Sequence, residues 1–193
     1  MLELVQIDKT FSPGTPGETK VFEGFSLTVP EGQFLSIVGG NGSGKTTLLN
    51  ILAAFDKPTS GEVLLSGRNI NDISEKEISA FRRENLGFVF QDFNLLDTFS
   101  LKDNIFLPLV LSHTPLAEME LRLTPIAAKL QITDILQKYP YEVSGGQKQR
   151  VAVARALITH PELVLADEPT GALDSKASTH LLNLFSDINR EGQ

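Results

Sequence analysis

The sequence predicts an α/β fold with a mostly parallel sheet, an N-terminal antiparallel β subdomain and a helical insertion subdomain. Three observations predict it. The first 38 residues alternate apolar and polar positions between glycine and proline breaks, which is typical of antiparallel strands. Later apolar runs are short and continuous, and they alternate with helical spacing, as in a parallel sheet covered by helices. Between residues 92 and 142, two segments have helical spacing.

The N-terminal elements follow in chain order. Strands are predicted over 2–7 (LELVQI), 25–29 (FSLTV) and 34–38 (FLSIV), with a loop at 12–19 (SPGTPGET). A glycine turn then leads into a helix from Lys45 to about Phe55. Residues 62–70 predict a hairpin with Ser66 and Gly67 at its tip.

The later elements are predicted in the same way. Ser74 and Glu77 have the spacing of a capping box that opens a helix through about Arg83. A buried strand is predicted at 86–90 (LGFVF), and the insertion has helical spacing at 101–111 and 116–132. The prolines expected to interrupt the insertion are Pro108, Pro115, Pro125 and Pro140. The chain then predicts a helix at about 145–159, a strand at 163–166 and a helix at 175–189.

Composition excludes several classes of protein. The formal charge of −7 and the pI of about 5.0 argue against nucleic acid as the main partner, because phosphate backbones select basic faces. The absence of cysteine excludes a disulfide framework and a thiolate metal site. The first residues do not have the pattern of a signal peptide, and no window holds 18 apolar residues. We therefore expect any membrane contact to be peripheral or through a partner.

The run GGNGSGKT, residues 39–46, matches the phosphate-loop pattern G-x-x-x-x-G-K-[ST]. A predicted strand precedes it and a predicted helix follows, so backbone N–H groups and the helix start would face one anion. Lys45 would reach the β and γ phosphates, Thr46 would offer a hydroxyl to Mg²⁺, and Thr47 would bond the α phosphate. The alternative is an ordinary glycine turn into a helix. The residues expected at the nucleotide are Gly39, Asn41, Gly42, Ser43, Gly44, Lys45, Thr46 and Thr47.

Two further segments support hydrolysis of a nucleoside triphosphate. The apolar run LVLADEPT, 163–170, ends in two carboxylates. Asp167 would hold Mg²⁺ through water, and Glu168 would polarise the attacking water. Gln91 directly follows the predicted strand LGFVF, where it would touch the Mg²⁺ or the water; the alternative is a surface glutamine. The predicted catalytic residues are Glu168, Lys45 and Gln91, and the predicted metal ligands are Thr46, Gln91 and Asp167.

A second glycine pair lies in VSGGQ, 143–147, again directly before a predicted helix. GGNGSGKT, Gln91, VSGGQ, LVLADE and GALD (171–174), taken in this order, resemble the ATP-binding subunit of the ABC transporters over essentially the whole chain. The segments QDFNLLDTFSLKDNIFLPLVL and ADEPTGALDSK are similar to the branch that serves macrolide export, lipoprotein release and bacitracin-type peptide resistance. The residues that follow Gln91 are most similar to those of the bacitracin-type peptide transporters.

The resemblance implies ATP and Mg²⁺ as cofactors and a second copy of the subunit as a partner. Two subunits would pack head to tail, with each ATP between the phosphate loop of one copy and the SGGQ helix start of the other. Phe11 would stack on adenine, where many members have Tyr, or would be a core residue, and Asp174 would line the subunit interface. Val143 replaces the commoner Leu of the signature. The residues expected at the partner's nucleotide are Ser144, Gly145, Gly146 and Gln147.

The resemblance also implies a separate integral-membrane permease, docked on the helical insertion and linked to the nucleotide through Gln91. The chain would then be cytoplasmic and peripheral on the inner face of the cell membrane. Residues 1–193 would form one ABC ATPase domain. Its parts would be a β subdomain with the phosphate-loop core (1–91), the insertion (92–142), and the signature helix, Asp-Glu strand and following helix (143–193).

One family motif is missing, a histidine at the end of a further strand that contacts the γ phosphate. The chain's histidines are His113, His160 and His180, and none is in that place. We therefore expect the 193-residue chain to be a piece of a longer one. We also expect it to hydrolyse ATP slowly, and a rate equal to that of a version extended through the histidine strand would contradict this.

Other functions remain open at the level of the sequence. One is an ATP-gated interaction module without turnover, recognised by ATP binding without phosphate release. Another is a soluble ABC ATPase that works on nucleic acid or ribosomes, which would need a basic surface. A metabolite kinase or GTPase would leave VSGGQ unexplained, and no guanine-reading Asn-Lys-x-Asp is present.

Overall fold

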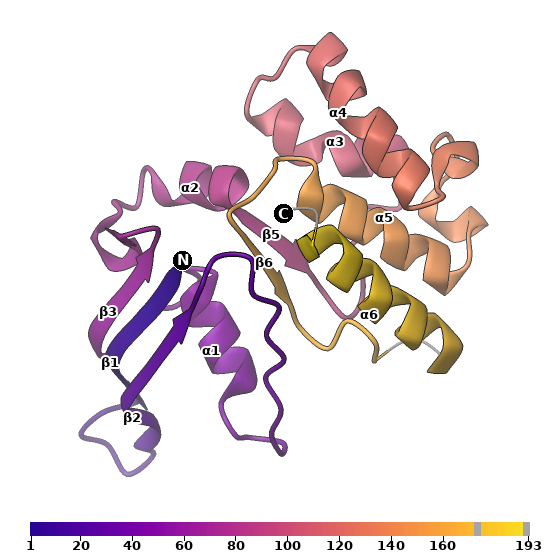
Figure 1. Cartoon of the computed structure of the whole chain (residues 1–193). Helices are drawn as coiled ribbons and strands as arrows, with labels where there is room; N and C mark the ends of the chain where they lie inside the picture. Colours follow the sequence, from indigo (N-terminus) through magenta and orange to yellow (C-terminus); the bar gives the residue numbers. More distant parts are fainter. Residues whose placement is uncertain (172–174, 191–193) are drawn as a thin grey trace. The chain divides into compact units, whose positions relative to one another are not determined.

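The structure, a computed structural model, describes residues 1–171 and 175–190 of the 193-residue chain (Figure 1). These residues fall into two compact units, the first over Met1–Ser79 and the second beginning at Ala80. The boundary lies in the first turn of helix α2 (Ile78–Asn85). The predicted division at residues 91 and 142 stays a prediction.

The first unit is built on a four-stranded antiparallel sheet in the order β2-β1-β3-β4 (Figure 1). Its strands are β1 (Leu2–Phe11), β2 (Thr19–Val29), β3 (Ser60–Leu65) and β4 (Arg68–Asn69). Alternate side chains of β1 and β3 are buried, among them Leu2, Leu4, Val63 and Leu65, as expected for a sheet with one covered face. The predicted N-terminal antiparallel subdomain is confirmed.

The hairpin tip between β3 and β4 is also confirmed. Ser66 has φ 49° and Gly67 has φ 78°, so both central residues are left-handed. Two left-handed residues make the primed turn whose twist matches that of paired strands. Ser74 and Glu77 do not form the predicted capping box: the Ser74 hydroxyl donates to the Glu77 carboxylate at 2.7 Å, and the N–H of Glu77 donates to the backbone carbonyl of Ser74 at 3.0 Å. Residues 75–77 form a turn, so α2 begins at Ile78.

The predicted strand over 34–38 is wrong. This stretch is not a strand, and it takes no part in the strand pairs found among the described residues. Its apolar side chains are exposed, with Phe34 at 50% and Val38 at 90%. A continuous apolar run predicts a strand with neighbours on both sides. Without a paired neighbour the backbone gains no ladder hydrogen bonds, so apolar content alone does not produce a strand.

The second unit contains a parallel pair of strands, β5 (Leu86–Val89) and β6 (Leu163–Ala166). Both were predicted, and their register runs from Leu86 opposite Leu163 to Val89 opposite Ala166. The α/β class with an antiparallel N-terminal sheet and a parallel sheet is therefore confirmed. Gly87 allows close packing on β5, because a side chain there would collide with the carbonyl of Ala156 on helix α5.

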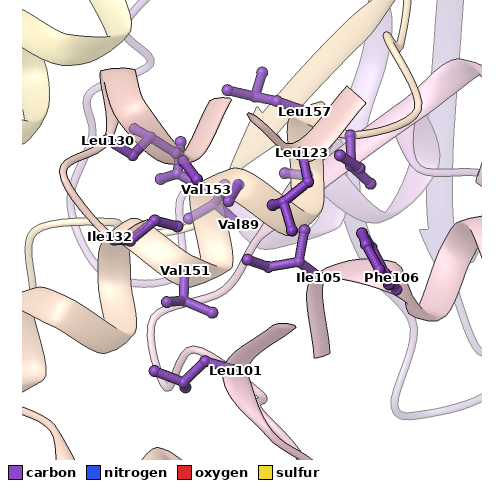
Figure 2. Close-up of a cluster of buried hydrophobic side chains, with 14 of the residues drawn as sticks. Val89, Leu101, Ile105, Phe106, Leu123, Leu130, Ile132, Val151, Val153 and Leu157 are labelled. Carbon is purple, nitrogen blue, oxygen red and sulfur yellow. The ribbon is translucent and has the colours of Figure 1, made fainter. Parts of the chain in front are cut away.

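The helices of the second unit bury one apolar core, whose central side chains Figure 2 shows. They are α3 (Leu101–Leu111), α4 (Leu116–Lys129), α5 (Gly145–Leu157) and α6 (Ser175–Arg190), with short 3-10 helices at 133–135 and 140–142. Leu181, Phe185 and Ile188 bring one face of α6 to this core. In the first unit, α1 (Lys45–Leu52) and a 3-10 helix at 70–72 complete the elements.

Two of the prolines do not interrupt their helices as expected. Pro108 lies inside α3 and Pro125 inside α4. Proline removes one hydrogen bond, but most helix stability in proteins comes from packing of an apolar face. Ile105, Leu109 and Leu123, near the two prolines, are almost fully buried. Burial of these side chains therefore continues both helices through the prolines. Within the described residues, none of the helices is long and apolar enough to cross a membrane.

Candidate functional site

The predicted phosphate loop forms a glycine turn that ends at the start of α1 in the first unit. Gly44 is the residue before the helix, with φ 94° and ψ 4°, and no side chain caps the helix. Within the turn, the N–H of Ser43 donates to the carbonyl of Gly40 at 3.3 Å. The first N–H groups of a helix have no acceptor inside it. The start of α1 therefore presents donors that a phosphate can use.

Lys45 folds back over this loop. Its ammonium nitrogen donates to the carbonyls of Gly39 and Gly40, each at 2.9 Å. The positive charge lies at the mouth of the turn, where the predicted β and γ phosphates would be. A phosphate oxygen is a stronger partner for an ammonium than a neutral carbonyl, so a bound triphosphate can replace these two bonds.

The glycines of the loop are required by its geometry at two positions. A side chain at Gly44 would come within 2.8 Å of a methyl carbon of Val21 and 3.0 Å of the ring of Phe22, besides its left-handed φ. A side chain at Gly39 would lie 2.6 Å from the hydroxyl of Ser43. The remaining predicted nucleotide residues, Asn41, Gly42, Ser43, Thr46 and Thr47, lie in the same turn and first helical turn, and all but the half-buried Thr47 are exposed.

Phe11 ends β1 and is 42% exposed, so it is not a core residue. The ammonium of Lys9 lies 4.7 Å from its ring centroid. Lys9 is itself buried, and it donates to the carboxylate of Asp56 at 2.7 Å and to the carbonyl of Lys57 at 2.8 Å. The sequence analysis missed Lys9. The sequence does indicate it, because Lys9 occupies a position of the predicted strand region that would face inward with the apolar residues.

In the second unit, Gln91 and the Asp-Glu pair lie at one edge of the parallel strands. Val89 ends β5 and Ala166 ends β6 opposite it, and the N–H of Asp167 donates to the carbonyl of Val89 at 3.1 Å. A side chain at Gly171 would lie 2.9 Å from the amide nitrogen of Gln91. The Gln91 side chain therefore lies against the turn that follows Glu168.

This turn exposes the predicted catalytic carboxylate. Glu168 has φ 44°, an uncommon left-handed value for a residue with a side chain. The N–H of Gly171 donates to its carbonyl at 2.9 Å, which closes the turn. Glu168 is exposed while Asp167 is half-buried. Left-handed backbone at a non-glycine residue is concentrated at functional sites, where the surrounding structure holds it.

The second glycine pair forms the start of α5. Ser144 is the cap: its hydroxyl accepts the N–H of Gln147 at 3.3 Å, and the Gln147 side-chain oxygen accepts the N–H of Ser144 at 2.9 Å. Side chains at Gly145 and Gly146 would meet nothing within 4 Å. This reciprocal cap was also missed, although the spacing S-x-x-Q in the sequence indicates it.

The predicted site residues thus belong to both units. Phe11 and the phosphate loop are in the first, and Gln91, Asp167, Glu168 and the SGGQ start are in the second. Asp174 lies outside the described residues. The predicted metal ligands are a hydroxyl, an amide oxygen and a carboxylate, and hard oxygen donors of this kind are what Mg²⁺ prefers. The uncapped start of α1, with Lys45 over its loop, fits the phosphates of ATP, and the Mg²⁺ ligands stay a prediction.

Comparisons with known proteins bear on the same motifs. A family model described as ABC transporter matches residues 22–171. The ABC transporter ATP-binding protein YvcR of Bacillus subtilis is 49% identical over 193 residues, which is 99% of this chain and 74% of that protein. The bacitracin export ATP-binding protein BceA of Halalkalibacterium halodurans is 44% identical over 192 residues, covering 99% of this chain and 75% of that protein.

The fold is likewise that of a solved ATP-binding cassette. The dimeric post-hydrolysis structure of the cassette MJ0796 with ADP and Pi has a TM-score of 0.86 to this chain at 37% identity. The match covers 100% of this chain and 84% of that one. The family and branch predicted from the motifs are confirmed by these matches. The chain belongs to the ABC transporter family, as one of its ATP-binding, ATP-hydrolysing cassettes.

Proposed function

We propose that this chain is the ATPase of an export transporter that confers resistance to an antimicrobial peptide of the bacitracin type. The observation that carries the proposal is the presence of two glycine-rich helix starts, of which only the one at α1 has a lysine over it. The likeness to BceA, whose name is that of a bacitracin export protein, supports the substrate class. Macrolide or lipid-like substrates belong to the same branch and are the alternatives.

The phosphate loop binds ATP in this proposal. The N–H groups at the start of α1 and the ammonium of Lys45 hold the β and γ phosphates, and Phe11 stacks on the adenine. Thr46, Gln91 and Asp167 would hold Mg²⁺, which would neutralise charge on the phosphates. Glu168 accepts a proton from water as the water oxygen bonds to the γ phosphorus. The bond from that phosphorus to the bridging oxygen breaks, and ADP leaves with the electron pair.

A second copy of the chain completes each site. Ser144, Gly145, Gly146 and Gln147 offer a helix start without side-chain obstruction to the γ phosphate of the partner's nucleotide. The dimeric MJ0796 cassette with ADP and Pi supports this arrangement. ATP then joins the two copies, and its hydrolysis lets them separate, which is a rigid-body switch.

The transported molecule crosses the membrane through a separate permease. The helical insertion is its docking surface, at the inner face of the cell membrane. Large apolar side chains are exposed along the insertion, including Leu96, Phe99 and Leu121. In the proposed complex the permease would cover these side chains.

The test is the solution mass of the Glu168→Gln variant, measured by light scattering with and without ATP and Mg²⁺. This change keeps the nucleotide site and removes the base. We expect a monomer without ATP and a dimer with it. Adding Ser144→Arg should keep ATP binding, measured separately by calorimetry, and abolish the dimer. Bound ATP with a monomer throughout would contradict the head-to-tail site. ATP binding without phosphate release, unrepaired in a version extended through the histidine strand, would favour a non-hydrolysing module.

A further inference from the structure

The loop that follows Gln91 has an unusual backbone. Phe93 and Asn94 are consecutive left-handed residues, with φ 62° and φ 47°. Left-handed backbone is disfavoured for residues with a side chain, and more so for an aromatic residue than for asparagine. The stretch from Gln91 to Ser100, called the Gln91 loop below, contains no helix or strand. Such a conformation persists only where other groups hold it.

Arg155, in the last turns of α5, contacts this strained pair directly. Its guanidinium nitrogen Nη1 donates to the carbonyl of Asn94 at 2.6 Å, and Nη2 donates to the carbonyl of Phe93 at 2.7 Å. Two parallel charged donors fix the direction of both carbonyls, which lysine cannot do. Burial lowers the pKa of Arg155, as expected for a guanidinium largely withdrawn from water. Within residues 1–171 and 175–190, these two carbonyls are the acceptors of the guanidinium.

The far end of the Gln91 loop is held by a different helix. Asn104 of α3 is fully buried. Its side-chain oxygen accepts the N–H of Leu96 at 2.7 Å, and its amide nitrogen lies 3.0 Å from the carbonyl of Leu96. The same nitrogen lies 3.2 Å from the carbonyl of Phe99 and 3.0 Å from that of Ser100. Asn104 thus fixes 96–100, and Arg155 holds the carbonyls of the half that adjoins Gln91.

The helix that carries Arg155 is also the helix that begins with SGGQ. Ser144 and Arg155 are 11 residues apart on one continuous hydrogen-bonded element, about 16 Å along its axis. A displacement of the start of α5 therefore moves Arg155 and the two carbonyls it holds. Gln91 is two residues before Phe93, so its side chain follows the same anchor.

We infer that Arg155 is a positioning residue that ties Gln91 to the signature helix, so that Gln91 is aligned for hydrolysis only when α5 is in place. The inference rests on the proposed function, because it assumes that Gln91 acts at Mg²⁺ and the attacking water, as proposed above. It adds a physical link between the residue that senses one copy's nucleotide and the helix that touches the other's. Arg155 acts through Gln91 and contacts no nucleotide itself.

A double-mutant cycle with Arg155→Ala and Gln91→Ala tests this link, with ATP hydrolysis and the half-saturating Mg²⁺ concentration as readouts. Each single change should lower the rate about tenfold, and the double variant should be no slower than the slower single one. Both singles should also raise the Mg²⁺ concentration needed. ATP affinity without Mg²⁺ should change by less than about twofold, because the phosphate loop is intact.

Two matched variants separate positioning from folding. Arg155→Lys keeps the charge and loses the paired geometry, so its rate should fall between those of Arg155→Ala and the unmodified chain. Arg190→Ala removes an arginine of α6 that pairs with Asp187, in the same unit, and should leave rate and Mg²⁺ dependence unchanged. If Arg155→Ala lowers the melting temperature below the assay range, Arg155→Lys replaces it in the cycle.

Amide hydrogen exchange tests the anchor without reference to activity. Residues 92–96 should exchange faster in Arg155→Ala than in Arg190→Ala. A double variant about a hundredfold slower than the unmodified chain would mean independent effects and would overturn the inference alone. Unchanged exchange at 92–96 would do the same. A full rate in Gln91→Ala would instead show that the proposed role of Gln91 is wrong, and the inference would fall with it.

Discussion

The two glycine-rich helix starts of this chain look alike in sequence and differ in structure. α1 begins after Gly44, a left-handed residue, and no side chain caps it. α5 begins after Ser144, an extended residue, and is closed by the reciprocal bonds between Ser144 and Gln147. At α1 the nearest charge is Lys45, held by carbonyls of its own loop.

This difference shows which groups satisfy the first N–H groups of each helix. α1 leaves its first donors to a ligand, so its loop is completed by an anion. α5 is complete by itself, so its stability does not depend on a ligand, and its open glycines let an anion approach from another molecule. One start is a binding site within its own subunit, and the other is a surface offered to a partner.

The largest effect should come from removing the charge at α1. We expect Lys45→Ala to weaken ATP binding at least about a hundredfold, since a charged phosphate contact is lost. Calorimetric titration of the monomer with ATP measures it. The matched change at the other helix start, Lys148→Ala, should alter ATP affinity of the monomer less than about twofold. Equal losses in the two variants would break the comparison.

A second, smaller effect should distinguish the glycines at the two helix starts by their contributions to stability. Gly44→Ala forces a side chain into a left-handed position against Val21 and Phe22, and should destabilise the first unit by about 1–3 kcal/mol. Gly146→Ala meets open space in ordinary helical backbone, so it should be neutral or stabilise α5 by about 0.5–1 kcal/mol. Denaturant unfolding of both variants provides the comparison. A loss at Gly146 as large as at Gly44 would contradict it.

The cap of α5 gives a smaller effect. Ser144→Ala removes the acceptor for the N–H of Gln147 and should lower the free energy of unfolding by about 1 kcal/mol. Ser43, two residues before the first residue of α1, caps nothing, so Ser43→Ala should change stability by less than about 0.5 kcal/mol. Thermal unfolding without nucleotide measures both. A costly Ser43→Ala would mean that α1 has a cap after all.

The smallest expected effect is a loss of stability at acid pH, which should be confined to the first unit. The hydroxyl of Ser60 and the N–H of Gly24 donate to Asp8, and these bonds hold the pKa of its carboxyl below the ordinary value. The stabilisation is present above the unfolded-state pKa and is lost as pH falls through the lower folded-state pKa. Asp8→Asn should therefore be less stable than the unmodified chain at pH 7, with the difference vanishing at strongly acid pH.

The control for this change is Asp134→Asn in the second unit, an exposed carboxylate for which no hydrogen bond is described. Its unfolding midpoint should follow that of the unmodified chain at every pH. If Asp8→Asn behaved in the same way, the bonds from Ser60 and Gly24 would contribute nothing to stability.

Much of this fold could be predicted because its signals are local. The hairpin at Ser66 and Gly67, the strands at 86–89 and 163–166 and the helix from Gly145 all follow from turn chemistry and apolar spacing. The same holds for Gln91 and Asp167, because the ends of neighbouring parallel strands meet at one edge.

The misses have a common cause, which is that a distant segment decides the outcome. Residues 34–38 have the composition of a strand, but a strand also needs a neighbour. Pro108 and Pro125 break helices by local rules, and packing overrides them. Arg155 and Lys9 look like ordinary charged residues in sequence, and only the tertiary structure brings their partners within reach.

The exposed segment at 34–38 also governs how the chain behaves in concentrated solution. Phe-Leu-Ser-Ile-Val combines apolar and β-branched residues without charge or proline, which is the composition of a sequence that self-associates through strand pairing. Such association grows with protein concentration and needs no nucleotide. A chaperone that binds apolar extended segments would compete for the same residues. We expect the colloidal stability of this chain to depend on these five exposed residues, which belong to neither of its two helix starts.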